Sequence, residues 1–112
     1  MIPFGDPSAS YQAHKSEIDQ AIKRVLDSGW YVLGTEVDAF EEEFASFHGQ
    51  DFHAVGVANG TDAIALCIRC LGLGTGDEII TPSHTAVATV AGIEQAGCTP
   101  VFADINPHTR CI

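Results

Sequence analysis

The fold of this chain follows from one segment, Ala54-Val55-Gly56-Val57-Ala58-Asn59-Gly60-Thr61-Asp62-Ala63-Ile64-Ala65-Leu66. It begins within a short apolar run, residues 52–57, that predicts a strand, and it ends within a longer run, residues 61–71, that predicts a helix. A turn of small residues joins the two. This order places free backbone N–H groups and the positive end of a helix dipole at the carboxyl end of a strand. Such a position suits a phosphate group.

Composition limits the class of protein. The chain has 112 residues, 46% of them hydrophobic, so it is expected to be one domain, or a piece of a larger one, with a packed core. Fifteen acidic and five basic side chains give a formal charge of −10, which argues against a nucleic-acid or anionic-membrane surface. No apolar run approaches the roughly 20 residues of a membrane span. The first residues lack the features of a signal peptide, so a cytosolic protein is expected.

From residue 52 onward, strands and helices alternate. The predicted elements are a strand over residues 52–57, a helix over 61–71, a strand over 78–81, a helix over 85–96 and a strand over 100–104. This alternation predicts an α/β fold with a parallel sheet and helical crossovers. Ligands bind such sheets beyond the carboxyl ends of the strands. Two turns lie at that edge, residues 58–62 and 82–85, and the most chemically capable side chain on either is His84.

Two short motifs suggest functions that their positions argue against. Gly72-Leu73-Gly74-Thr75-Gly76-Asp77 is rich in glycine like a nucleotide loop, but it follows a helix and leads into a strand, the reverse of the dinucleotide fingerprint. Cys67 and Cys70 form a CxxC inside the predicted helix, and no second CxxC completes a zinc site. We interpret the first motif as a tight connection and the two cysteines as buried helix residues.

The first 51 residues are predicted to be a helical segment that precedes the sheet. Residues 1–15 are expected to be irregular. Ser16 is predicted to cap a helix that ends at Gly29, with an apolar stripe of Ile18, Ala21, Ile22, Val25 and Leu26. Thr35 is predicted to cap a helix that ends at Gly49 and buries Val37, Phe40, Phe44 and Phe47. The run Glu41-Glu42-Glu43 is interpreted as a solvated helix face rather than a metal site.

Five segments, taken in order, resemble one protein family. They are Ser28-Gly29-Trp30-Tyr31-Val32-Leu33-Gly34, Phe40-Glu41-Glu42-Glu43-Phe44-Ala45, Asn59-Gly60-Thr61-Asp62-Ala63-Ile64, Gly76-Asp77-Glu78-Ile79-Ile80-Thr81-Pro82-Ser83-His84-Thr85-Ala86-Val87-Ala88-Thr89 and Pro100-Val101-Phe102-Ala103-Asp104-Ile105. Together they resemble the N-terminal part of the DegT/DnrJ/EryC1/StrS aminotransferases, which are pyridoxal-phosphate enzymes that aminate nucleotide-linked keto-sugars. The sequence of residues 83–89 favours members of the family that act on 3-keto sugars.

The resemblance implies a fold, a cofactor and partners. The fold would be the N-terminal part of the large domain of a fold-type-I PLP-dependent transferase. Residues 1–51 would be its N-terminal helical segment, and residues 52–112 the beginning of the α/β domain that binds pyridoxal 5'-phosphate. The full-length protein would be a cytoplasmic homodimer that binds a nucleotide-sugar substrate and an amino-acid donor.

The resemblance also assigns roles by position. Gly60 and Thr61 would donate backbone N–H groups to the cofactor phosphate, and Thr61 its hydroxyl as well. His84 would lie flat against the pyridine ring and orient it. Tyr31 would line the substrate side of the cleft, with simple packing between two helices as the alternative. Asp62, an anion beside a phosphate, is expected to point away from it.

The residues that would perform the transfer are expected beyond residue 112. Such an enzyme needs a lysine that binds the cofactor covalently and moves a proton, and a carboxylate beside the pyridine nitrogen. Lys15 and Lys23 lie on or before the first predicted helix and are not substitutes. The 112 residues are therefore expected to be catalytically inactive and to bind pyridoxal phosphate weakly at most.

Other functions stay open at this point. Within the family, a PLP-dependent sugar dehydratase or a regulator would have the same N-terminal sequence. A different class is a non-catalytic α/β module that binds a phosphorylated ligand at Gly60 and Thr61, and a third is a redox module that uses Cys67 and Cys70. The 61–71 helix is apolar on nearly all sides, so we expect protein to cover it, through self-association.

Overall fold

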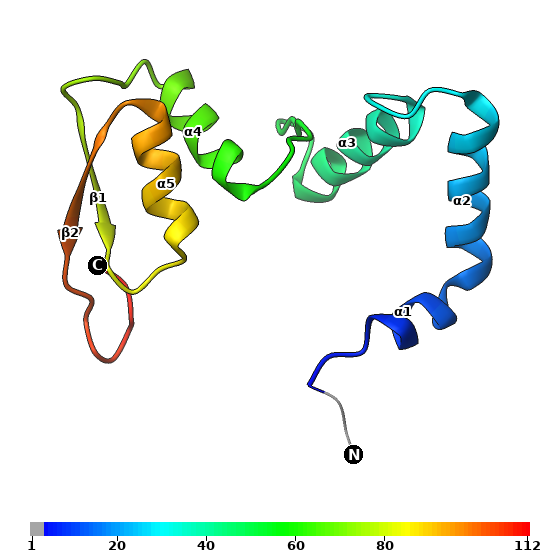
Figure 1. Ribbon diagram of the computed structural model, residues 1–112, viewed down its shortest axis with the longest axis horizontal. Coiled ribbons are helices and arrows are strands. Elements are labelled where there is room, and N and C mark those ends of the chain that lie inside the picture. The colour runs from blue at the N-terminus through cyan, green and yellow to red at the C-terminus, as the bar shows by residue number, and fades with distance from the viewer. Residues whose placement is uncertain (1–3) are drawn as a thin grey trace. The chain divides into compact units, whose positions relative to one another are not determined.

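Figure 1 shows the computed structural model of the chain, which describes residues 4–112. The chain forms two compact units, one that ends at Gly56 and one that comprises Val57–Ile112. The elements are, in order, α1 (Pro7–Ala13), α2 (Lys15–Ser28), α3 (Thr35–His48), α4 (Gly60–Cys70), β1 (Glu78–Pro82), α5 (Val87–Ala96) and β2 (Thr99–Ala103). This order confirms the predicted α/β class. The division predicted between residues 51 and 52 stays a prediction.

The second unit contains a parallel pair of strands joined by a helix. β1 pairs with β2 in a register that runs from Glu78 opposite Thr99 to Pro82 opposite Ala103, and α5 is the crossover between them. The predicted bounds of α4, β1, α5 and β2 are confirmed to within two residues. In Figure 1, α4 and α5 run in the opposite direction to the strands. The N-termini of both helices therefore lie toward the end of the unit at which the strands end.

The core of this unit lies where α4 and α5 pack together beside the sheet. Its buried residues are Ala65, Ile68, Ile93, Ala96 and Cys98, and Ile64, Leu73 and Ile79 pack against them. The opposite face of α4 is open, because Leu66 is 45% exposed. The expected covering of that face by a second copy stays a prediction.

Cys67 and Cys70 are exposed free thiols, so the prediction that they are buried is wrong. The helix buries the face that carries Ala65 and Ile68. Residues one or two positions away on a helix do not share a face, and both cysteines stand in that relation to Ile68.

Residues 72–77 form the predicted tight connection between α4 and β1. Gly72 and Gly76 have φ values of 76° and 99°, which are left-handed conformations that favour glycine. The Asp77 carboxylate accepts the N–H of Gly74 at 2.8 Å and closes the turn.

Residues 52–57 do not form the predicted strand. A strand requires a hydrogen-bonded neighbour, and the bonds of this segment go elsewhere. The Phe52 N–H donates to the Gly49 carbonyl at 3.5 Å, and the Gly56 N–H donates to Glu41 Oε1 at 2.6 Å. Glu41 is half-buried as a result, so it is not part of a fully solvated acidic face, whereas Glu42 and Glu43 are exposed as predicted.

An additional helix, α1, lies in a region predicted to be irregular. Asp6 Oδ1 accepts the Ala9 N–H at 3.0 Å and Pro7 takes the first helical position, a combination that favours a helix start. The prediction for residues 1–3 lies outside the described residues. Ser16 is not a cap as predicted, because α2 already begins at Lys15. Gly29 ends α2 with a φ of 68°, as predicted.

Polar contacts link the helices of the first unit. Arg24 of α2 donates to both carboxylate oxygens of Glu36 in α3, at 2.6 and 2.9 Å. These hydrogen bonds raise the pKa of Arg24 and lower that of Glu36. Lys15 of α2 donates to Asp19 and to the hydroxyl of Tyr11 in α1, and these bonds raise its pKa.

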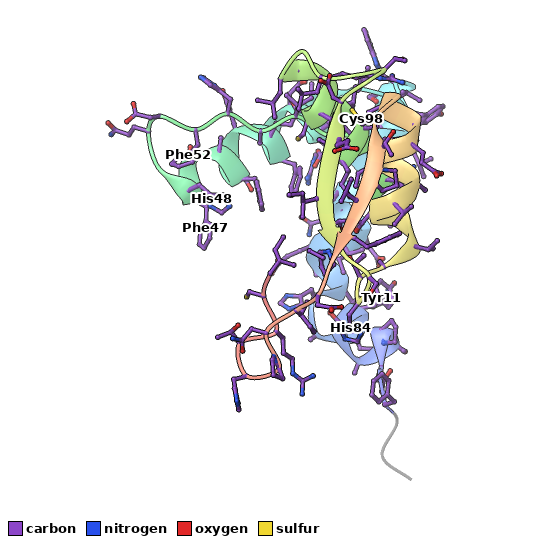
Figure 2. All side chains as sticks on the ribbon, turned by 90° about the vertical axis from the view of Figure 1, so that its left-hand side faces the viewer. Tyr11, Phe47, His48, Phe52, His84 and Cys98 are labelled. Atoms are coloured by element: carbon purple, nitrogen blue, oxygen red, sulfur yellow. The ribbon has the colours of Figure 1, made fainter. Side chains whose placement is uncertain are left out.

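The aromatic face of α3 is exposed, contrary to the prediction. Gly34 takes the cap position expected for Thr35, and Gly49 ends the helix as predicted. Phe40, Phe44 and Phe47 are 57%, 48% and 84% exposed. Aromatic rings instead pack along the end of the helix, where His48 lies 4.8 Å from Phe44, 5.4 Å from Phe47 and 6.1 Å from Phe52 between ring centroids (Figure 2). Among the described residues, none of α3 is buried.

Candidate functional site

The first turn of α4 keeps two backbone donors available. Asn59 is the N-cap, and its Oδ1 accepts the Asp62 N–H at 2.9 Å while its carbonyl accepts the Ala63 N–H at 3.1 Å. Within residues 4–112, the N–H groups of Gly60 and Thr61 donate to no protein acceptor. These two donors and the helix dipole form a place where an anion can bind.

The space in front of these donors is open. A Cβ atom on Gly60 would meet no atom of residues 4–112 within 4 Å, so an anion can approach the backbone there. Thr61 is half-buried. Its carbonyl oxygen faces α5, where it would lie 2.9 Å from a Cβ on Gly92. The first turn of α4 is therefore open on one side and packed against α5 on the other.

The Asp62 carboxylate is held by two amides. Its Oδ2 accepts from Asn59 Nδ2 at 2.9 Å, and its Oδ1 accepts from Gln95 Nε2 of α5 at 3.2 Å. The guanidinium of Arg69, near the end of α4, donates to the backbone carbonyl of Gln95. The carboxylate is thus bonded toward α5.

His84 lies in the loop between β1 and α5. Its side chain is exposed, and Figure 2 shows it at the end of the unit where β2 also ends. The next residue, Thr85, joins its hydroxyl to that of Thr89 at 2.9 Å, which ties the loop to the first turn of α5. His84 therefore lies toward the same end of the unit as the N-terminus of α4. The described residues contain no hydrogen bond between His84 and Gly60 or Thr61.

Tyr31 belongs to the other unit. It is 67% exposed, in a connector between α2 and α3 where Trp30 Nε1 donates to the Val32 carbonyl at 2.5 Å. Tyr31 lines a cavity of about 40 Å³ together with Val25, Glu36 and Val37. The cavity is too small for a sugar nucleotide, whose site would need several hundred Å³.

A model of the DegT/DnrJ/EryC1/StrS aminotransferase family matches residues 12–112. The chain belongs to this family. It is 49% identical over 110 residues to the dTDP-3-amino-3,6-dideoxy-alpha-D-galactopyranose transaminase of Aneurinibacillus thermoaerophilus, covering 96% of this chain and 30% of that protein.

Two solved structures that are similar in sequence share the fold of this chain. S. venezuelae DesV superposes with a TM-score of 0.88 at 48% identity, covering 94% of this chain and 28% of DesV. The Bacillus subtilis protein NtdA, solved with bound cofactor PMP, superposes with a TM-score of 0.78 at 31% identity, covering 87% of this chain and 22% of NtdA. The chain thus spans less than a third of the length of these relatives.

Sequence reasoning missed two residues of this DegT/DnrJ/EryC1/StrS chain, Gly92 and Gln95. Both lie on α5 and contact the first turn of α4. A glycine in the interior of a helix is a signal of close packing and identifies Gly92 as a candidate. Gln95 carries no local signal, because its partner Asp62 lies 33 residues away.

The described residues of this family member contain neither a metal-ligand cluster nor a membrane-spanning helix. Their His, Cys, Asp and Glu side chains do not form a group of three or more that could hold a metal ion. Among the same residues, no helix has both the length and the apolar character needed to cross a membrane.

Proposed function

We propose that this chain forms the cofactor-phosphate site of a pyridoxal-phosphate-dependent aminotransferase that acts on nucleotide-linked keto-sugars. The observation that carries the proposal is that the N–H groups of Gly60 and Thr61, at the start of α4, donate to no acceptor among residues 4–112. Family membership supports the identity of the anion, because the related NtdA structure contains bound PMP.

The residues around this turn fit a phosphate. Gly60 leaves the approach open, and Thr61 adds a hydroxyl that can donate a third hydrogen bond. The nearest carboxylate, that of Asp62, already accepts from Asn59 and Gln95. When bound, pyridoxal phosphate supplies an electron sink for moving an amino group. The role proposed for His84 is to hold the pyridine ring by stacking against its face.

The proposal leaves the covalent step to a lysine that residues 57–112 do not supply. That segment contains no lysine. Lys15 and Lys23 both lie in α2 of the other unit, and each is paired with an aspartate one turn further along, Asp19 and Asp27. We therefore expect that mixing this chain with pyridoxal phosphate gives no absorbance band of a lysine-bound cofactor.

The substrates and partners are proposed from the relatives. The Aneurinibacillus relative is by name a transaminase of a dTDP-linked sugar, which favours a nucleotide-sugar substrate and an amino-acid donor for the whole protein. We also propose a cytoplasmic homodimer in which Tyr31 contacts the substrate. The exposed ring of Tyr31 supports this role, because an aromatic face can stack on a sugar or base.

A titration followed by amide NMR tests the phosphate site. Inorganic phosphate and pyridoxal phosphate are added in turn, and the amide signals of Gly60 and Thr61 are expected to move most. The Thr61→Val variant keeps the backbone donor but removes the hydroxyl, so its affinity should fall roughly three- to tenfold. Thr75→Val, in the exposed turn after α4, is the matched control and should bind like the unchanged chain. Signals that move elsewhere, with Gly60 and Thr61 unaffected, would refute the site.

A further inference from the structure

We propose that Gln95 is a positioning residue for the phosphate turn. By holding the Asp62 carboxylate toward α5, Gln95 keeps the negative charge of that carboxylate away from the N–H groups of Gly60 and Thr61. The inference rests on the proposed phosphate site and adds a residue of α5 to it.

The need for such a residue follows from the position of Asp62. It is the third residue of α4, next to Thr61, and its side chain is a carboxylate. A carboxylate in the first turn of a helix is attracted by the same N–H groups and the same dipole that would bind a phosphate. Left free, it would compete with the phosphate for those donors and repel it.

The structure shows what prevents this competition. One carboxylate oxygen accepts from Asn59, which is a local bond within the cap, and the other accepts from Gln95 at 3.2 Å. Only the second bond directs the carboxylate toward another element. The backbone of Gln95 is itself held in place, because its carbonyl accepts from Arg69 and because Gly92, one turn earlier, packs against Ile64 and Thr61.

Steric crowding does not hold the carboxylate in place. Asp62, Arg69 and Gln95 line an open cavity of about 270 Å³ on this face of α4. A carboxylate released by Gln95 therefore has room to change rotamer. Hydrogen bonds, and not packing, set its direction, and the bond from Gln95 is the one that holds it toward α5.

Four forms of the chain test the proposal: the unchanged protein, Gln95→Ala, Asp62→Asn and the double variant. Inorganic phosphate is the probe, and the dissociation constant is read from the amide signals of Gly60 and Thr61. We expect Gln95→Ala to weaken phosphate binding roughly three- to tenfold, the effect of one lost hydrogen bond plus one freed charge. In the Asp62→Asn background the same change should weaken binding less than about twofold, because no charge remains to be released.

Two further variants guard against an indirect effect. Glu94→Ala truncates the adjacent exposed side chain of α5 and should bind phosphate like the unchanged protein. Gln95→Glu keeps the shape of the side chain but replaces the donor with a second carboxylate, so it should weaken binding at pH 7 at least as much as Gln95→Ala. Rescue by Asp62→Asn is the readout that a merely structural role of Gln95 would not produce.

The outcomes separate the two proposals. If phosphate moves Gly60 and Thr61 and the Gln95 variants bind it normally, Gln95 has no positioning role while the phosphate site stands. If Gln95→Ala weakens binding equally with Asp62 and with Asn at position 62, the loss is structural and the inference is wrong. If phosphate moves neither amide in the unchanged protein, the phosphate site itself is refuted and the inference falls with it.

Discussion

Gly92 of α5 lies against Ile64 of α4 so closely that a Cβ on Gly92 would come within 2.9 Å of the Ile64 side chain. The same Cβ would lie 2.9 Å from the Thr61 carbonyl oxygen. This contact sets the distance between α5 and the turn that we propose binds a phosphate. Its consequences can be measured.

The variant Gly92→Ala is expected to destabilise the chain by about 1–3 kcal/mol, because the added methyl group must push two packed helices apart. Chemical denaturation measures the loss. Gly74→Ala is the matched control, since the nearest atom to a Cβ there is the Ala96 carbonyl oxygen at 3.8 Å. Equal stability of the two variants would contradict the close contact.

The variant Gly60→Ala is expected to separate stability from binding. A Cβ there would meet no atom of the described part of the chain within 4 Å, so stability should be unchanged or should rise by up to about 1 kcal/mol. The methyl group would stand where a phosphate approaches the N–H groups, and phosphate affinity should fall. Thermal melting and the amide titration measure the two effects separately. Full phosphate affinity in a folded Gly60→Ala chain would argue against the site.

The variant His84→Ala is expected to weaken binding of the cofactor's pyridine ring without weakening binding of its phosphate group. If the imidazole stacks on the pyridine ring, the variant should bind pyridoxal phosphate more weakly and inorganic phosphate unchanged. Competition between the two probes in one amide titration gives both affinities. His108→Ala, in the exposed turn after β2, serves as the matched control. A loss of affinity for both probes would place His84 at the phosphate and not at the ring.

The Arg24–Glu36 pair is expected to make stability depend on pH in the acid range. Hydrogen bonds from Arg24 lower the pKa of Glu36 below its ordinary value of 4.5. A lowered carboxyl pKa adds stability that is fully present above pH 4.5 and is lost as pH falls through the folded-state pKa. Melting temperatures of the unchanged chain and of Glu36→Gln should therefore converge in acid. Glu43→Gln, on the exposed face of α3, should show no such convergence.

Local sequence signals predicted much of the second unit correctly. The bounds of α4, β1, α5 and β2 follow from the periodicity of apolar residues and from glycines at helix ends. Both signals depend only on residues that are close together in the chain. The same reasoning failed for residues 52–57. An apolar run can only propose a strand, whereas the hydrogen bonds of Phe52 and Gly56 go to Gly49 and Glu41.

The apolar stripes of the first unit show the same limit. Periodicity correctly predicted helices that carry Ile18 to Leu26 and Val37 to Phe47. It also predicted that these faces are buried, yet no residue of α1, α2 or α3 is buried in the described structure. Periodicity identifies which side chains share a face, and burial additionally requires another element to cover that face.

By itself, the sequence determined the order of elements after residue 58, the helix start at Gly60 and Thr61, and the family to which the chain belongs. Those features depend on short-range hydrogen bonds, dihedral preferences and ordered motifs, all of which are determined by residues that are neighbours in the sequence. Only the tertiary structure decided that Gly92 touches Ile64 and that Gln95 holds Asp62. These contacts join residues about thirty positions apart, and they depend on how closely two helices pack.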